Sequence, residues 1–161
     1  MRHLYGGGGI ALIAALSATP VLSQAANFGN LTLSPGFPPG SAVVTGHTGG
    51  AYSLPSIANS DRNKKPCIGF GSETPDHIMV LEKDFPRLTV LVNSRGKDTT
   101  LLIRGPGNSI MCGDDTEGRK DAAVEATDWK AGRYEIWVGS IEARQRWNYT
   151  LTVREQAGRI R

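Results

Sequence analysis

Four acidic side chains stand near the two ends of a segment whose pattern predicts a β-hairpin. They are Asp98, Asp114, Asp115 and Glu117. The runs 99–104 and 109–112 read as paired strands, and the residues 105–108 between them, Gly-Pro-Gly-Asn, are turn formers. Because positions at similar distances from a hairpin turn face each other, we expect the acidic side chains to lie close together.

Calcium binding is the chemistry that such a cluster offers. Calcium takes six to eight oxygen ligands from carboxylates, carbonyls and water, and these four side chains could supply several of them. The spacing is not that of an EF-hand loop. Turn formation is the alternative explanation, because Asp and Gly are common in solvated turns. Calcium is the only cofactor that the sequence suggests.

The two cysteines, Cys67 and Cys112, predict a disulfide. An isolated pair in an exported chain is typical of such a bond. Closing a loop of this length would stabilise the fold by about 4 kcal/mol on the chain-entropy estimate. The alternatives are two free thiols or a metal pair, although two cysteines alone do not complete a zinc site.

Residues 46–50, Gly-His-Thr-Gly-Gly, resemble the surroundings of a trypsin-type nucleophile. Thr48 would be the nucleophile, and His77 is the one histidine in position to act as its base. His3 lies in the predicted signal segment. His47 is adjacent to Thr48, and neighbouring side chains on an extended segment point in opposite directions. A working triad also needs a buried acid. A small secreted serine- or threonine-type hydrolase is therefore the alternative function, and it requires Thr48 and His77 within hydrogen-bond reach. A glycine-rich loop explains the segment without catalysis.

Trp137 is the best candidate for an exposed aromatic residue that binds sugars or peptides. It is out of phase with Tyr134, Ile136 and Val138, which share one face of an alternating run. The alternative is that both faces of this strand are covered, since buried tryptophan is common.

Short runs of alternating apolar and polar residues predict an all-β fold. They are 77–82, 88–93, 99–104, 109–112, 134–140 and 148–154. Runs of period two separated by turns predict an antiparallel sandwich or barrel. Residues 122–126 are compatible with either a weak strand or a short helix.

The ends of the chain predict an exported protein of one domain. Residues 1–25 have the basic, apolar and small-residue regions of a signal peptide, with cleavage after Ala25 or Ala26. A retained membrane anchor is the alternative, although the apolar run is marginal in length. Residues 26–66 form an irregular Gly/Pro-rich segment with one strand at 42–45, expected to pack on a core of 67–155, and 156–161 form a tail.

The charge balance gives no reason to expect a nucleic-acid partner. Lys and Arg exceed Asp and Glu by three, 18 against 15, and the basic residues are scattered along the chain. We therefore expect no nucleic acid and, once the signal is removed, no membrane insertion. The expected location is the periplasm or the medium.

Several motifs occur in the order found in a known family. They are Pro75-Asp76-His77, the run 88–92, the run 98–103, Gly105-Pro106-Gly107, Cys112-Gly113-Asp114-Asp115 and the run 132–139. Together they resemble the bacterial pre-peptidase C-terminal type of domain in a small stand-alone form, over roughly residues 67–153. The resemblance implies a jelly-roll-like β-sandwich that accompanies secreted peptidases without performing their chemistry. Some family members bind calcium, and some bind collagen or other matrix polymers.

One departure from the family concerns calcium. The family's calcium ligands lie largely in an N-terminal segment rich in Asp, Glu and Asn, which has no match here.

Taken together, the sequence features predict an exported, non-catalytic binding or structural β-sandwich module, associated with peptidases by family and stabilised by a disulfide. Its partner is expected to be a protein or an extracellular polymer.

Overall fold

The computed structural model describes residues 25–116 and 118–156, and every long element in that part of the chain is a strand. The strands are β1 (Leu31–Leu33), β2 (Val43–His47), β3 (Tyr52–Ser53), β4 (Phe70–Gly71), β5 (His77–Leu81), β6 (Phe85–Asn93), β7 (Thr99–Arg104), β8 (Ile110–Thr116), β9 (Arg119–Trp129), β10 (Gly132–Ser140) and β11 (Asn148–Glu155). Three short 3-10 helices accompany them: η1 (Pro39–Ala42), η2 (Leu54–Ser56) and η3 (Pro106–Asn108). Within the described residues, no helix has the length and apolar character needed to cross a membrane.

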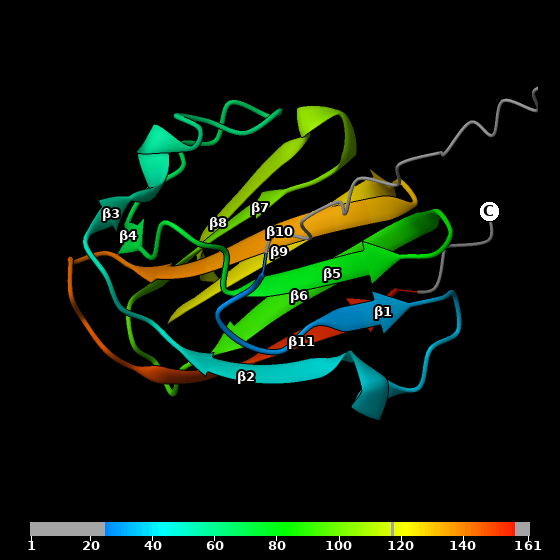
Figure 1. Ribbon diagram of the computed structural model, residues 1–161, viewed down its shortest axis with the longest axis horizontal. Helices are drawn as coiled ribbons and strands as arrows, with labels where there is room; N and C mark the ends of the chain where they lie inside the picture. The colour runs from blue at the N-terminus through cyan, green and yellow to red at the C-terminus, as the bar shows by residue number, and fades with distance from the viewer. Residues whose placement is uncertain (1–24, 117, 157–161) are drawn as a thin grey trace, which may run out of the picture.

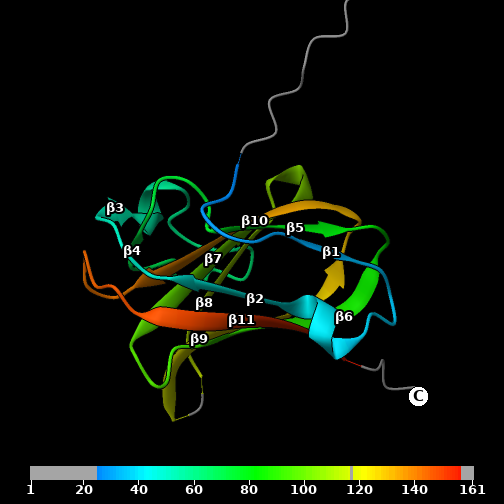
Figure 2. The ribbon, with the colours of Figure 1, turned by 60° about the horizontal axis from the view of Figure 1, so that its bottom comes forward.

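The strands form two layers that are joined through β8. One layer has the order β1-β5-β10-β7-β8, with β3 and β4 attached beside β10, and the other has the order β8-β9-β6-β11-β2. Figure 2 shows the layers nearly edge-on, with β10 and β5 in one and β11 and β9 in the other. All pairs are antiparallel except β1 with β5. The prediction of an antiparallel β-sandwich is confirmed.

The alternating runs bury the faces that their pattern indicates. In β6 the side chains of Leu88, Val90 and Val92 are almost fully buried in the core between the layers. Apolar side chains from β1, β5, β7, β10 and β11 complete the same cluster. Residues 122–126, which fitted a strand or a helix, lie within β9, which pairs with β6 on one side and with β8 on the other.

The Gly/Pro-rich N-terminal segment contributes more strand than its composition suggests. β1 adds to the edge of one layer beside β5, and β2 adds to the edge of the other beside β11 (Figure 1). Leu31 and Leu33 enter the main core from β1. The strand expected at 42–45 corresponds to β2, whereas β1 has no local signal because it is three residues long and pairs with β5 far along the chain.

The predicted disulfide between Cys67 and Cys112 is present, with the two Cα atoms 5.3 Å apart. It fastens the segment that follows η2 to β8, on the outer side of the first layer. Beneath this segment lies a second, smaller apolar cluster, formed by Leu54, Cys67, Leu102, Cys112 and Trp137. The bond therefore holds a cover over a face that would otherwise meet solvent.

Candidate functional site

The carboxylates of Asp98, Asp114 and Asp115 come together at one corner of the sandwich. One carboxylate oxygen from each lies within 4.8 Å of the others. Asp98 and Asp114 are partly buried and Asp115 is exposed. Pairing of Leu101 with Gly113 and of Leu102 with Cys112 brings the start of β7 beside the second half of β8. The predicted closeness of these three side chains is confirmed, while their metal binding stays a prediction. Glu117 lies outside the described residues.

This corner is where β8 passes from one layer to the other. Residues up to Gly113 pair with β7, and residues from Asp114 onward pair with β9. A side chain at Gly113 would place its Cβ 2.2 Å from the carbonyl oxygen of Ala123, so glycine is required for this close approach. The register of β8 against β9 shifts between Asp115 and Thr116. Such irregularities redirect side chains at the ends of strands.

A buried threonine braces the same corner. Thr99, fully buried at the start of β7, accepts a hydrogen bond at its Oγ1 from the backbone N–H of Ala122 at 3.0 Å. The cationic group recorded beside the cluster is Lys120, whose Nζ lies 3.3 Å from Asp98 Oδ2. The lysine is well exposed and the pair is therefore weak. The corner thus carries three carboxylates, one of them paired with an exposed lysine, on a braced backbone.

Thr48 and His77 do not form a nucleophile–base pair. The Thr48 hydroxyl donates to the carbonyl oxygen of Gln145 at 2.7 Å and accepts from the backbone N–H of Trp147 at 2.9 Å. His77 Nδ1 donates to the carbonyl oxygen of Gly29 at 2.7 Å, and its Nε2 accepts from the Tyr149 hydroxyl at 2.8 Å. Both side chains are fully buried. The contact between Thr48 and His77 that the hydrolase alternative requires is therefore not present.

His77 belongs instead to a buried polar group that anchors the N-terminal segment. The neighbouring Asp76 carboxylate, 3 % exposed, accepts from the backbone N–H of Val138 at 2.8 Å and from Asn27 Nδ2 at 3.1 Å. Burial raises the pKa of Asp76 from 3.8 to about 6, against the smaller opposing effect of these hydrogen bonds. Burial also lowers the pKa of His77 below its usual 6.5 and raises that of Tyr149. A neutral imidazole fits the two hydrogen bonds that His77 makes.

Trp137 is not an exposed binding residue, so that expectation is wrong. Its side chain is 2 % exposed and lies in the apolar cluster beneath the segment held by Cys67 and Cys112. The Arg104 guanidinium lies over its ring, 5.2 Å from the centre. The strand is covered on both faces, which is the alternative that the sequence left open.

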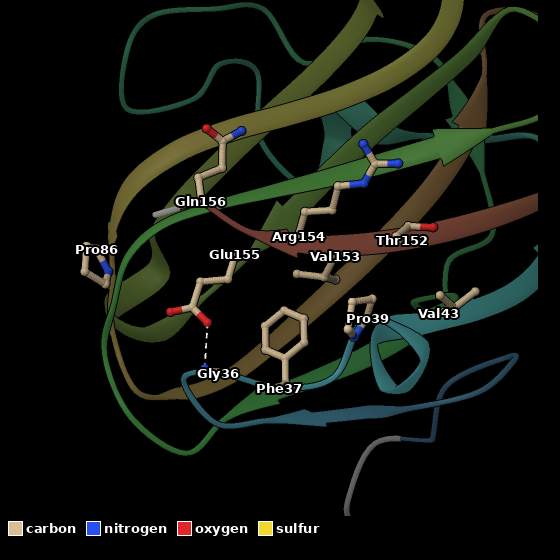
Figure 3. Close-up of a pocket in the computed structure, with 10 residues that line it drawn as sticks. All are labelled: Gly36, Phe37, Pro39, Val43, Pro86, Thr152, Val153, Arg154, Glu155 and Gln156. Carbon is tan, nitrogen blue, oxygen red and sulfur yellow. Dashed lines mark hydrogen bonds between the residues drawn. The ribbon is translucent and has the colours of Figure 1, made fainter. Parts of the chain in front are cut away.

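An apolar hollow of about 700 Å³ lies at the end of the sandwich where β2 begins and β11 ends. Figure 3 shows the Phe37 ring and Pro39 facing Val153, with Val43 beside them. Glu155 accepts a hydrogen bond from the backbone N–H of Gly36 at 2.7 Å and closes one side of the hollow. The hollow offers apolar contact area and few side chains that could take part in catalysis.

The polar group around Asp76 was not predicted from the sequence. Its members come from the N-terminal segment, β5, β10 and β11, and only the fold brings them together. The available signal was the pair Asp76-His77 at the start of an apolar strand, because two adjacent polar residues are unusual where a strand enters a core.

Solved structures of related shape include the following two proteins. One is the pre-peptidase C-terminal domain of a collagenase from Bacillus anthracis, at 11 % identity and a TM-score of 0.44, covering 78 % of this chain and 94 % of that one. The other is CorA, a surface-associated copper-binding protein of Methylomicrobium album BG8, at 8 % identity and a TM-score of 0.44, covering 82 % of this chain and 100 % of that one. No family model matches the sequence, and no curated protein matches it. The first structure is of the type that the sequence resembles; at these scores neither protein's ligand is transferred to this chain.

Proposed function

We propose that this chain is an exported, non-catalytic β-sandwich binding module whose acidic corner takes a calcium ion. The observation that carries the calcium site is the placement of Asp98, Asp114 and Asp115, with one oxygen of each within 4.8 Å of the others. Calcium is held by carboxylates, backbone carbonyls and water together, so three aspartates, of which Asp115 is exposed to solvent, suit it. A disulfide is typical of exported proteins and supports that location.

The polar groups that could otherwise serve catalysis are engaged in holding the fold. Thr48 fixes the segment before β11, and Asp76 and His77 fix the N-terminal segment to β5 and β10. A general base must reach the proton that it abstracts, and both nitrogens of His77 already have partners. These contacts support a binding or structural role.

Calcium-dependent melting tests the proposal. Purified protein is stripped with EDTA and melted with and without excess calcium chloride. At a calcium concentration about 100 times the dissociation constant, binding adds about 2.7 kcal/mol, which raises the melting temperature by several degrees. An unchanged melting temperature in calcium would contradict the calcium site.

A paired variant makes the test specific to the corner. In Asp114→Asn with Asp115→Asn, calcium should no longer raise the melting temperature. Without calcium this variant should be as stable as the wild type or slightly more stable, because repulsion between neighbouring carboxylates is relieved. The matched control is Glu73→Gln with Glu125→Gln, which removes the same charge outside the cluster and should keep the calcium response.

A further inference from the structure

A second concave surface lies at the other end of the sandwich from the apolar hollow. Its walls are the end of β2 (45–47), the loop after β6 (93–97) and the start of β11 with the residues before it (146–150), and Phe28 contributes one side. Its volume is about 880 Å³. It is at the end toward which the arrowheads of β2 and β6 point (Figure 1). We call it the basic groove.

The residues that line the basic groove include several cations and no acidic side chain. Arg95, Lys97 and Arg146 are exposed and line it together with His47, and no acidic side chain is among its lining residues. Among the described residues, none of these three cations has an acidic side chain within 4.0 Å, unlike Arg87 and Lys130, which do. Cations gathered in a concave surface attract anions more strongly than scattered ones.

Buried polar contacts fix the loop that carries two of these cations. Ser94 is buried and donates its hydroxyl to Asp121 Oδ1 at 2.5 Å, and the backbone N–H of Lys97 donates to Ser94 Oγ at 3.1 Å. The backbone N–H of Arg95 donates to Asn93 Oδ1 at 3.1 Å. The nearby carboxylate of Asp121 is thus used to brace the loop. Arg95 and Lys97 are therefore presented from a fixed backbone.

Trp147 provides an aromatic surface in the same groove. It is the partly exposed member of the three tryptophans, since Trp129 and Trp137 are each 2 % exposed. Its backbone is held by Thr48. The groove is closely packed at Gly46, because a side chain there would place its Cβ 2.5 Å from the Tyr149 hydroxyl.

Short polar side chains cross the groove in a row. Thr45 pairs with Thr150, and Thr150 pairs with Asn93, so the three lie side by side on neighbouring strands. Asn148, which pairs with His47, begins the next row. Hydroxyl and amide groups both donate and accept hydrogen bonds, as sugar hydroxyls do. The groove thus combines cations, an aromatic ring and groups suited to hydroxyls.

We propose that the basic groove binds an acidic polysaccharide, a sugar chain that carries carboxylate or sulfate groups. This deepens the proposed function by naming the class of partner, and it rests on the chain being an exported binding module. Arg95, Lys97 and Arg146 contact the acidic groups, the Trp147 ring stacks on a sugar ring, and the polar row bonds to hydroxyls. Single-stranded nucleic acid fits less well, because its binding sites stack successive bases on several aromatic rings, whereas the Phe28 ring of this groove packs against His47 and His77.

Titration of the full protein with defined polymers tests this inference. Alginate and dextran sulfate are the acidic probes, neutral dextran is the uncharged control, and a thymidine oligonucleotide and poly-glutamate represent the other polyanions. Tryptophan fluorescence should change on binding, and Trp147→Phe should remove most of that change because the other two rings are buried. Binding should weaken as salt rises. All titrations contain EDTA, so bound calcium cannot bridge the protein to the polymer.

Matched charge variants locate the binding. Arg95→Gln, Lys97→Gln and Arg146→Gln together should lower the affinity for both acidic polymers by about tenfold or more. Lys64→Gln, Lys65→Gln and Lys83→Gln remove the same charge outside the groove and should lower it by less than about threefold. Both triple variants should melt at the wild-type temperature.

Four results would overturn the inference: no binding of either acidic polymer, equal binding of neutral dextran, tighter binding of the oligonucleotide or poly-glutamate, or equal losses in the two triple variants. If the acidic polymers do not bind but calcium still raises the melting temperature, the groove proposal is contradicted and the calcium proposal is not.

Discussion

Trp147 donates its backbone N–H to the hydroxyl oxygen of Thr48 at 2.9 Å, and the same hydroxyl donates to the carbonyl oxygen of Gln145. One buried threonine on the segment after β2 therefore holds the turn that precedes β11. The glycine-rich surroundings of Thr48 resemble those of a nucleophile, yet its hydroxyl is fully used in this contact. These two hydrogen bonds explain why a residue with a hydroxyl group stands at this position.

Thr48→Val should destabilise the protein by about 2 kcal/mol, because the N–H of Trp147 and the carbonyl of Gln145 lose a buried partner. Thr48→Ser keeps the hydroxyl and should recover most of the loss. Urea unfolding of the three proteins measures this. A Thr48→Val variant as stable as the wild type would show that these hydrogen bonds do not stabilise the fold.

Loss of the disulfide should cost about 4 kcal/mol, given the separation of 45 residues between Cys67 and Cys112. The paired variant Cys67→Ala with Cys112→Ala avoids new thiol chemistry, and chemical unfolding gives the difference. Exposure of Trp137 should rise as well, since the bond fastens its cover. A loss below about 1 kcal/mol would contradict this role.

Asp76 should make stability depend on pH in an unusual direction. Its pKa is about 6 in the folded protein against 3.8 in the unfolded chain, so the folded state binds more protons between these values. Ionisation of the buried carboxyl therefore costs stability as the pH rises from about 4 to above 6, by roughly 3 kcal/mol in total. His77 acts in the opposite direction, because its lowered pKa costs stability as the pH falls below 6.5.

The variant Asp76→Asn separates these two effects. It lacks the carboxyl but can still accept from the N–H of Val138, and the amide of Asn27 can turn to suit it. Between pH 4 and pH 7, its stability relative to the wild type should rise by roughly 3 kcal/mol. Denaturation at a series of pH values measures the difference. A relative stability that is independent of pH would contradict the raised pKa of Asp76.

Gly113→Ala should destabilise the corner by about 2 kcal/mol or more, because the new methyl would meet the carbonyl oxygen of Ala123. Gly40→Ala is the matched control, since nothing lies within 4 Å of the corresponding position and its φ is not left-handed. Melting of both variants, with and without calcium, gives the comparison. Equal stability of the two would contradict the close approach of β8 and β9.

Sequence patterns predicted the elements whose partners are implied by local alternation. The expected runs 88–93, 99–104, 134–140 and 148–154 lie within β6, β7, β10 and β11, and the β7–β8 hairpin brings Asp98 close to Asp114 as expected. β1 was missed because a strand of three residues in parallel pairing with β5 has no local signal. β9 was ambiguous because alanine has little preference for strands, and pairing on both sides decides its conformation.

The functional surfaces could be predicted only in part. Trp137 stands out of phase with the core face, but its exposure depends on a distant segment held by Cys67, which no pattern near Trp137 reveals. The basic groove was not foreseen, because Arg95 and Arg146 come from loops about fifty positions apart in the sequence. Charges that are scattered along the chain become a patch only when β6 and β11 pair.

Titration calorimetry with calcium is the most direct test of the proposed site. Calcium chloride is added to EDTA-stripped, desalted wild-type protein and to the Asp114→Asn, Asp115→Asn variant. We predict saturable binding of one calcium ion by the wild type and no measurable binding by the variant, with magnesium giving a weaker response. Absence of saturable binding to the wild type, or equal binding by the variant, would contradict a calcium site formed by Asp98, Asp114 and Asp115.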